Sequence, residues 1–384
     1  MNINLNLTNL YLQKLSSVKS DYNYQSNPIR MGTDSVSFGS TVHYEKAKNI
    51  FSAIKNSKRV GILLHKDVDA DALSSGILFF NLLKKRYIDK DIQLVINQKI
   101  PKYCANIPNI STIVQYKDLN NKSFDTVVVL DCDETRVDCY DIFDNAKIKI
   151  NIDHHKNRLN NPKFEQKLRI LEPDAVSTTQ VIYDNFFLPF GIWPDKSMVE
   201  CIMTGVVTDS GNFRNIPNPE SFSKSMDLLA HYSKIPLSVL TRNINNKFTA
   251  SKQRSDELEK FFTETIEQRK NIHIHKTPNN YKIDYILVDK NLLDKYNIKD
   301  DEADIKETLN NIMGMNKPKC DITAILWQRE NGDIRLSMRS MNKNVLEIAE
   351  AFGGGGHKFA AGAPVSGKLV DALEKVLKAI DEKY

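Results

Sequence analysis

Four separate segments of the chain combine aspartate and histidine in patterns that can hold metal ions. These segments are His65-Lys66-Asp67-Val68-Asp69-Ala70-Asp71, Asp131-Cys132-Asp133, Asp153-His154-His155 and Thr208-Asp209-Ser210-Gly211. Carboxylate oxygens together with one or two imidazoles suit a hard or borderline divalent ion such as Mn²⁺ or Mg²⁺. The sequence contains no Cys-x-x-Cys pair, so structural zinc is not expected.

Many carboxylates gathered in one place repel one another unless cations neutralise them. Two divalent ions that share a bridging carboxylate, about 3.5 to 4 Å apart, would neutralise them and activate water for attack on phosphorus. Taken singly, each segment has a simpler interpretation. An Asp-x-Asp after a strand is commonly a helix cap or turn, and a lone histidine such as His65 is commonly a core residue. The four segments together favour a metal site, because three of them directly follow apolar runs.

A glycine-rich segment near the C-terminus is the second candidate site. It reads Gly353-Gly354-Gly355-Gly356-His357-Lys358-Phe359-Ala360-Ala361-Gly362 and follows an expected helix from Val345 to Phe352. Successive glycines let backbone N–H groups approach an anion, which predicts a phosphate cradle. A flexible loop between two helices is the alternative interpretation. The residues expected to bind substrate are Gly354, Gly355, Gly356, His357 and Lys358, together with Arg335, Ser337 and Arg339 from a nearby strand.

The elements that would position the acidic segments alternate between short β-branched runs and longer helical stretches. Buried strands are expected at Val60–Leu64, Gln93–Ile96, Thr126–Leu130 and Ile148–Ile152. One helix is expected around Leu73–Leu83, and a second runs from a capping box at Ser177 and Gln180 through Phe186. This alternation predicts an α/β fold with a doubly wound, mainly parallel sheet. The metal-binding segments would emerge together at the carboxyl edge of that sheet.

A second, smaller α/β domain with a mixed sheet is expected toward the C-terminus. Its strands are expected at Tyr285–Val288, Ile322–Gln328 and Ile334–Arg339. The last two form a hairpin, and Asn331-Gly332 between them suits a type I′ turn. Apolar and polar residues alternate along the last strand, which places Arg335, Ser337 and Arg339 on its cationic face. The active site is expected in the cleft between the two domains.

A chain of 384 residues suits two domains of ordinary size. Residues 1–43 are rich in Asn, Ser and Thr with weak apolar periodicity, so a disordered or mobile leader is expected there. The catalytic metal-binding domain is expected at 44–233, a helical linker at 234–275 and the substrate-binding domain at 276–384. The mixed charges of Ser251–Lys270 are typical of a connecting helix.

The composition is that of a globular protein, with 41% hydrophobic and 26% charged residues. There is no run of about 18 apolar residues and no secretion signal, so a cytoplasmic protein without membrane association is expected. The five cysteines are scattered and are expected to be ordinary thiols. The net charge of +5, from 53 basic and 48 acidic residues, is too balanced for a protein that coats long nucleic acid. A small anionic ligand at one local site remains compatible with it.

Together these motifs resemble the DHH phosphoesterases, named for the Asp153-His154-His155 triplet. The branch with the DHH-associated C-terminal domain carries Gly-Gly-Gly-His-x-x-Ala-Ala-Gly, which also occurs here, and the resemblance covers about residues 44–380. It implies two Mn²⁺ ions, the first held by His65, Asp69 and Asp131 and the second by Asp71, Asp131, His154 and Asp209. Asp131 would bridge the two ions. The resemblance also implies that His155 contacts the phosphate or assists proton transfer, and that Asp153 orients a histidine.

The first motif departs from the family pattern His-x-x-Pro-Asp-Gly-Asp-Ala at two positions. Val68 replaces the proline and Ala70 replaces the glycine. Neither position supplies a metal ligand, so metal binding is expected to survive, but the turn before Asp71 has to accept a Cβ. Asp133 is an alternative ligand to Asp131, and the position of Asp131 directly after the strand favours Asp131.

Size and motifs look most like the nano-RNase and pAp-phosphatase branch of the family. The resemblance implies a Mn²⁺-dependent enzyme, with Mg²⁺ as a possible substitute. Its substrates would be oligoribonucleotides from dinucleotides to about pentamers, and 3′-phosphoadenosine 5′-phosphate (pAp), converted to AMP. The alternatives are a cyclic or linear dinucleotide (pApA) phosphodiesterase, a RecJ-like single-strand DNA exonuclease and a manganese pyrophosphatase. A degenerate nucleotide-binding paralogue is the non-enzymatic alternative, and a homodimer is compatible with the sequence.

Overall fold

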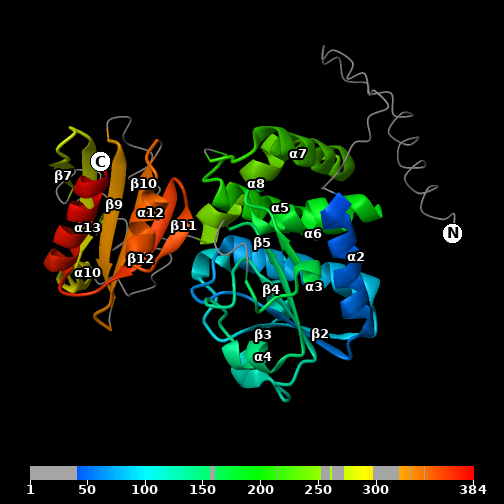
Figure 1. The fold of residues 1–384 in the computed structure, drawn as a ribbon. Coiled ribbons are helices and arrows are strands. Elements are labelled where there is room, and N and C mark those ends of the chain that lie inside the picture. Colours follow the sequence, from blue (N-terminus) through cyan, green and yellow to red (C-terminus); the bar gives the residue numbers. More distant parts are fainter. Residues whose placement is uncertain are drawn as a thin grey trace, which may run out of the picture.

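The computed structural model describes residues 41–155, 161–213, 215–251, 260–261, 272–296, 320–329, 331–340 and 342–384. Figure 1 shows two lobes, each built around its own β-sheet. Residues 1–40 of the expected leader lie outside the described part. Helix α2 (Thr41–Asn56) begins at residue 41, within the last three residues of the leader expected at 1–43. Most of the expected connecting helix at Ser251–Lys270 also lies outside it. Among the described residues, none of the helices is long and apolar enough to cross a bilayer.

The N-terminal lobe contains a six-stranded sheet in which every pair of neighbouring strands is parallel. Its strands are β1 (Arg59–Leu63), β2 (Asp91–Ile96), β3 (Ile113–Gln115), β4 (Thr126–Leu130), β5 (Ile148–Asp153) and β6 (Arg169–Leu171). Their order is β3-β2-β1-β4-β5-β6, so the direction of the winding reverses between β1 and β4. The expected doubly wound parallel sheet is thereby confirmed.

Apolar side chains on both faces of this sheet explain why its strands are continuous hydrophobic runs. All five residues of β4 are buried, as expected for a strand covered by helices on both sides. The larger core cluster lies against α2, α3 (Ala70–Arg86), α5 (Thr178–Ile182) and α6 (Lys196–Asp209). A smaller cluster on the opposite face includes Phe143 of α4 (Tyr140–Asn145) and Phe164.

Local caps set the starts of the helices near the carboxyl edge of the sheet. Asp69 caps α3 by accepting a hydrogen bond from the Ala72 N–H at 3.0 Å. Ser177 caps α5, as its pairing with Gln180 predicted, by accepting from the Gln180 N–H at 3.2 Å. Helix α5 continues as a π-helical turn at Tyr183–Phe187, which fits the expectation of a helix through Phe186.

Two further helices complete the N-terminal lobe, α7 (Pro219–Ser233) and α8 (Leu237–Ser251). Leu240 and Ile244 of α8 are buried in the larger core cluster. The sequence placed residues 234–275 in a linker, but at least the first half of α8 packs onto the N-terminal lobe. Its apolar residues recur at helical spacing, and that amphipathic face is buried rather than exposed as in a bridging helix.

The C-terminal lobe contains a second six-stranded sheet with the order β11-β12-β10-β9-β8-β7. Its strands are β7 (Ile272–Lys276), β8 (Lys282–Val288), β9 (Ile322–Gln328), β10 (Ile334–Ser340), β11 (Gly355–His357) and β12 (Ala360–Val365). Only the β8–β9 pair is parallel among these strands, so the sheet is mixed, as expected. The described helices of this lobe are α10 (Lys290–Lys295), α12 (Val345–Ala351) and α13 (Leu369–Lys383).

The β9–β10 hairpin has the expected strands but a longer turn than a type I′ turn allows. The Arg329 N–H donates to the Asp333 carbonyl at 2.8 Å, and the Gly332 N–H donates to the Arg329 carbonyl at 2.9 Å. Three residues therefore separate the paired positions, and Gly332 has the positive φ of 89°. The expectation of a two-residue turn is wrong, because the strand register places Asp333 opposite Arg329.

The glycine-rich segment forms a strand rather than an open loop. Gly355–His357 is strand β11, which pairs with β12 and lies at the edge of the C-terminal sheet nearest the N-terminal lobe (Figure 1). A Cβ on Gly354 would lie 2.2 Å from the carbonyl oxygen of Gly362. Close packing against β12 therefore requires glycine at position 354, and the role of these glycines in anion binding remains a prediction.

Candidate active site

The acidic and histidine segments meet at the carboxyl edge of the N-terminal sheet, where the winding reverses. His65 lies just after β1, Asp131 directly follows β4, and Asp153 is the last residue of β5. Asp209 ends helix α6 on the same side. Open α/β sheets bind their ligands at such a switch point. The side chains that lie within 4.8 Å of one another in overlapping groups are His65, Asp69, Asp71, Asp131, Asp153, His154, His155, Asp209 and His357.

Asp131 lies between two groups of side chains that could each hold an ion. Its Oδ2 atom is 3.5 Å from Nε2 of His65, and its Oδ1 atom is 3.5 Å from Nε2 of His154. The carboxylate is 3% exposed, and its backbone adopts a left-handed conformation with φ of 62°. Aspartate tolerates this conformation better than most residues, and such strain is common at functional sites. The two oxygens of the Asp131 carboxylate therefore lie near two different histidines.

The two buried imidazoles present Nε2 to the carboxylates because Nδ1 is held elsewhere. Nδ1 of His65 donates to the Lys66 carbonyl at 2.7 Å, and Nδ1 of His154 lies 3.3 Å from the Ala175 carbonyl. Nε2 of His154 is buried without a hydrogen bond, although it lies 3.1 Å from Asp209 Oδ2 and 3.9 Å from Asp71 Oδ2. A buried imidazole lone pair facing carboxylate oxygens fits a divalent cation.

Asp71 is held by the start of helix α5. The backbone N–H groups of Thr178 and Thr179 donate to its two oxygens at 2.7 and 3.3 Å. Gly205 of α6 packs directly on the same carboxylate, since a Cβ there would lie 2.1 Å from Asp71 Oδ1. Asp71 therefore points toward His154 in one fixed orientation.

The electrostatics of the cluster favour positive charge beside its carboxylates. Burial, reinforced by Asp131 and Asp209, raises the pKa of Asp71 well above its ordinary value. Burial disfavours a charged His65, but hydrogen bonding to Asp131 and Asp69 outweighs it and raises the pKa of His65 to about 10. These raised pKa values mean that Asp71 and His65 favour their protonated forms. Divalent cations bound at the cluster would displace these protons.

Asp153 holds His155, which lies two residues further along the chain. Its Oδ1 atom accepts hydrogen bonds from the backbone N–H of His154 at 2.8 Å and of His155 at 3.1 Å, and lies 2.8 Å from Nδ1 of His155. Burial opposes ionisation, but the two histidines lower the pKa of Asp153 to about 2. The ionised carboxylate fixes Nδ1 of His155 as a donor, so the second ring nitrogen, Nε2, is the one that can accept a proton or contact another group.

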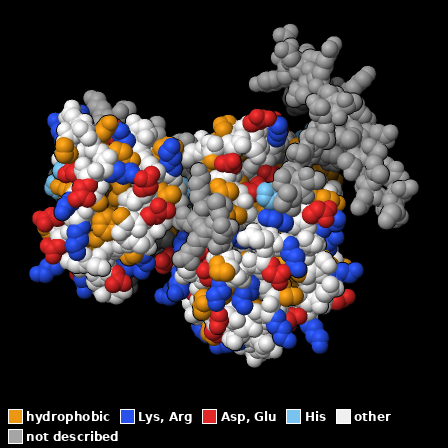
Figure 2. Space-filling view, in the orientation of Figure 1, with side chains coloured by type: hydrophobic (Ala, Val, Ile, Leu, Met, Phe, Trp, Pro, Cys, Tyr) orange, Lys and Arg blue, Asp and Glu red, His pale blue; other side chains and the backbone are white. Residues whose placement is uncertain are grey.

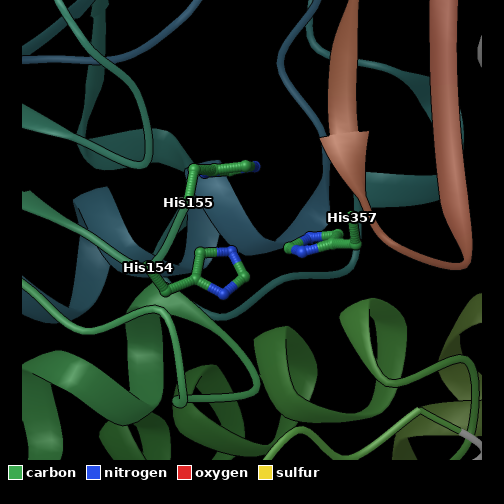
Figure 3. A group of neighbouring side chains, drawn as sticks. All are labelled: His154, His155 and His357. Atoms are coloured by element: carbon green, nitrogen blue, oxygen red, sulfur yellow. The ribbon is translucent and has the colours of Figure 1, made fainter. Parts of the chain in front are cut away.

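The C-terminal lobe contributes His357 to this cluster. Its ring stacks on His155 with centroids 5.1 Å apart and lies 4.9 Å from the His154 ring (Figure 3). Its Nε2 atom is 3.5 Å from Asp209 Oδ2. Burial, with further contributions from His154 and His155, lowers the pKa of His357, while Asp209 opposes the shift. The last residue of β11 therefore closes the site from the second lobe.

The other expected substrate residues lie on β10 and in the β11–β12 turn. Nη2 of Arg335 is 3.3 Å from Asp67 Oδ2 of the first motif, and Nη2 of Arg329 is 3.5 Å from Asp67 Oδ1. Arg339 donates to the Met338 carbonyl at 3.0 Å, with its Nη1 3.5 Å from the Ser337 hydroxyl. The backbone carbonyl of Lys358, in the β11–β12 turn, accepts a hydrogen bond from the N–H of Val345, the first residue of α12, at 2.9 Å.

The two unusual residues of the first motif fit the local structure. Ala70 is the first residue of α3 and is buried without a positive φ, so its Cβ is accommodated. Val68 supplies a backbone N–H that a proline would lack, and it donates to Gln98 Oε1 at 3.0 Å. Asp133 accepts from the N–H and hydroxyl of Thr135, so it caps a turn while Asp131 joins the cluster.

Sequence reasoning missed several residues that support the site. Thr178 donates its hydroxyl to Asp131 Oδ1 at 2.7 Å, and Gln98 donates to the His65 carbonyl at 2.9 Å. Asn151 donates to the Cys132 carbonyl at 2.8 Å and so holds the backbone beside Asp131. For Thr178 a signal existed, because the capping box at Ser177 marks a helix start whose N–H groups favour anions. For Gln98 and Asn151 no local pattern identifies the partner.

Comparison with known families agrees with the two-domain fold. Residues 59–206 match the DHH family, N-terminal domain, and residues 294–384 match the DHHA1 domain. The chain belongs to the DHH family of phosphoesterases, with both domains in the family's order, and is a hydrolytic enzyme. The resemblance inferred from the motifs is confirmed. DHH phosphoesterases depend on metal, and the acidic and histidine groups described above can bind it.

Two curated relatives share its organisation along nearly their whole length. The chain is 26% identical over 348 residues to the bifunctional oligoribonuclease and PAP phosphatase NrnA of Thermus thermophilus, covering 89% of this chain and 95% of the relative. It is 24% identical over 312 residues to the protein of the same name from Bacillus subtilis, covering 79% and 89%. Among solved structures, an exopolyphosphatase-related protein from Bacteroides fragilis shares the fold, with a TM-score of 0.68, 21% identity and coverage of 88% and 96%.

Proposed function

We propose that this chain is a Mn²⁺-dependent enzyme that hydrolyses short oligoribonucleotides, from dinucleotides to about pentamers, to mononucleotides. The same site would convert pAp to AMP. The names of the relatives from Thermus thermophilus and Bacillus subtilis support both activities. Metal binding and catalysis belong to the N-terminal lobe, and substrate binding belongs to the C-terminal lobe from β7 onward.

The observation that carries this proposal is the position of Asp131 between two sets of ligands. On one side its Oδ2 atom faces His65 and Asp69, and on the other its Oδ1 atom faces His154. Asp71 and Asp209 complete the second set. Each set would hold one ion, and Asp131 would be shared. The mixture of carboxylate and imidazole donors suits Mn²⁺, with Mg²⁺ as a weaker fit because of the nitrogen donors.

Two ions bound here would activate water and stabilise negative charge on the reacting phosphate. His155 lies beside this position, and its Nδ1 atom is fixed by Asp153. We assign to His155 a contact with the phosphate oxygen or the transfer of a proton at Nε2. His154 is more deeply buried, with Nε2 surrounded by carboxylates, and is assigned to metal binding alone.

The second lobe supplies groups that would bind the end of a short substrate. His357 and Arg335 reach toward the N-terminal lobe from β11 and β10, while Ser337 and Arg339 share the polar face of β10. Binding groups on both lobes would hold the two ends of a short substrate. A long strand would have to extend beyond one of these groups, so short substrates would be favoured. On the face shown in Figure 2, basic and acidic side chains are interspersed over both lobes, unlike a continuous cationic track for a longer strand.

The proposal is tested with the Asp131→Ala variant and a panel of substrates. Wild-type protein with Mn²⁺ should release mononucleotides from RNA dinucleotides and phosphate from pAp. Asp131→Ala should lose both activities. Asp133→Ala is the matched control, because Asp133 lies two residues away but caps a turn through Thr135. Wild-type rates in Asp131→Ala would contradict the proposed site.

The same panel separates the proposed substrates from the alternatives. It contains short RNA, short single-stranded DNA, pAp, pApA and pyrophosphate, each with Mn²⁺. Turnover of RNA dinucleotides and pAp ahead of the others supports the proposal. Preference for pApA or for single-stranded DNA would instead identify a dinucleotide phosphodiesterase or an exonuclease. Metal binding without turnover of any substrate would indicate a nucleotide-binding paralogue.

The role of His357 is tested by its effect on the Michaelis constant. His357→Ala should mainly raise KM, because the side chain would contact substrate from the second lobe and is not assigned as a metal ligand. An unchanged KM with a reduced kcat would place His357 in the chemical step instead. An unchanged KM and kcat would remove it from the site.

A further inference from the structure

Thr178 is the one described residue that donates hydrogen bonds to two of the clustered carboxylates through two different groups. It is the first residue of helix α5 and is completely buried. Its hydroxyl donates to Asp131 Oδ1 at 2.7 Å, and its backbone N–H donates to Asp71 Oδ2 at 2.7 Å. Thr178 therefore connects these two side chains through one hydrogen bond to each.

A bridging carboxylate needs such a partner more than an ordinary ligand does. Rotation about the last torsion of an aspartate is only weakly restricted, because it joins an sp³ carbon to an sp² carbon. If the Asp131 carboxylate rotated, its two oxygens would no longer face His65 and His154 separately. A hydrogen bond to Oδ1 from a fixed donor removes this freedom.

Thr178 is well suited to be that fixed donor. Its Cβ is branched, which restricts its first side-chain torsion, and its backbone is held in the first turn of a capped helix. Burial excludes water from the contact, so the hydroxyl has no solvent competitor. The backbone bond to Asp71 holds the same residue against the second carboxylate.

We propose that Thr178 is a positioning residue that fixes Asp131 in its bridging orientation and couples it to Asp71. This inference rests on the proposed two-metal function. Thr178 touches no ion and no substrate in this scheme, and it acts through the two carboxylates. Its loss should weaken binding at the set formed by Asp71, Asp131, His154 and Asp209 more than at the set around His65.

The test compares three variants of the full chain. Thr178→Val removes the hydroxyl but keeps the branched shape and the N–H to Asp71. Thr178→Ser keeps the hydroxyl. Thr126→Val is the matched control, because Thr126 is an equally buried threonine at the opposite end of β4, where its hydroxyl lies 2.5 Å from that of Ser57.

Calorimetric titration with Mn²⁺ alone gives a readout that does not depend on turnover. Thr178→Val should bind one of the two ions about 10- to 100-fold less tightly than wild type, as expected for an outer partner of a metal ligand, while the other ion is affected less. Thr178→Ser should restore most of the affinity, and Thr126→Val should bind like wild type. Thermal unfolding of the apo proteins checks that the two valine variants fold alike.

The outcomes distinguish the positioning role of Thr178 from the proposed two-metal function. Two-ion binding by wild type together with equal affinity in Thr178→Val would overturn the positioning role and leave the proposed function intact. Failure of wild type to bind two ions would overturn the proposed function and the inference with it. Failure of Thr178→Ser to restore affinity would show that the shape of the side chain matters rather than its hydroxyl, which also contradicts the inference.

Discussion

Gly205 in helix α6 offers a direct way to disturb one expected metal ligand without replacing it. A Cβ at this position would lie 2.1 Å from Asp71 Oδ1 and 2.3 Å from the hydroxyl oxygen of Thr179. Because a non-bonded carbon and oxygen need more than 3 Å, Gly205→Ala requires a displacement of about 1 Å of the carboxylate or of the helix. The Asp71 carboxylate is itself held by two N–H groups, so both partners resist the movement.

Two opposing effects set the change in stability. Alanine is favoured over glycine in a helix interior by about 1 kcal/mol, whereas overpacking a close-packed core costs about 1 to 3 kcal/mol. Gly205→Ala should therefore lower the free energy of unfolding by about 0 to 2 kcal/mol. Its effect on function should be larger, because a misplacement of about 1 Å in a catalytic site can reduce the rate about 100-fold.

The assay combines urea unfolding, Mn²⁺ titration and hydrolysis of an RNA dinucleotide. Gly76→Ala is the control, because Gly76 also lies in a buried helix, α3, and the three atoms nearest to its added Cβ would be methyl carbons of Leu94 and Leu64 at 2.8 to 3.3 Å. We expect normal Mn²⁺ affinity in Gly76→Ala and weakened affinity in Gly205→Ala. Equal Mn²⁺ affinity and activity in both variants would refute the assigned role of Asp71.

Three further predictions concern the surroundings of the site. Asp67→Asn should free Arg335 for an anionic substrate and lower KM about two- to fivefold at low salt, as expected for an exposed ion pair; an unchanged KM would contradict this. Burial raises the pKa of Asp184 to about 7 from an ordinary 3.8, so the folded state binds the extra proton and stability should fall as pH rises across that interval. Asp184→Asn should remove this fall in urea unfolding at pH 4 and 7. Val68→Pro removes the N–H bonded to Gln98 and should lower the free energy of unfolding by about 1 kcal/mol.

The sequence was informative where residue pattern and chain direction determine position. Continuous apolar runs such as Thr126–Leu130 predicted buried parallel strands, and the observed strand has the same bounds. Because parallel strands end at one edge, residues directly after them were expected to meet, and His65, Asp131 and Asp153 do lie close together. The Ser177 cap was predictable because it depends on residues three positions apart.

The parts that could not be predicted depend on contacts between distant segments. The hydrogen bond from Thr178 to Asp131 joins residues 47 positions apart, and the ion pair between Arg335 and Asp67 joins the two lobes. The turn of the β9–β10 hairpin was misjudged because strand register, and not the Asn331-Gly332 dipeptide alone, sets its length. Likewise, Gly354 is required by the approach of β12, which sequence pattern does not reveal.

The central claim is that Asp131 is shared between two metal ions. Anomalous diffraction from crystals grown with Mn²⁺ tests it most directly, because the manganese signal locates each ion independently of the protein. The account predicts two peaks about 3.5 to 4 Å apart, one next to Oδ2 of Asp131 beside His65 and one next to Oδ1 beside His154. A single peak, or two peaks that do not both contact Asp131, would contradict it.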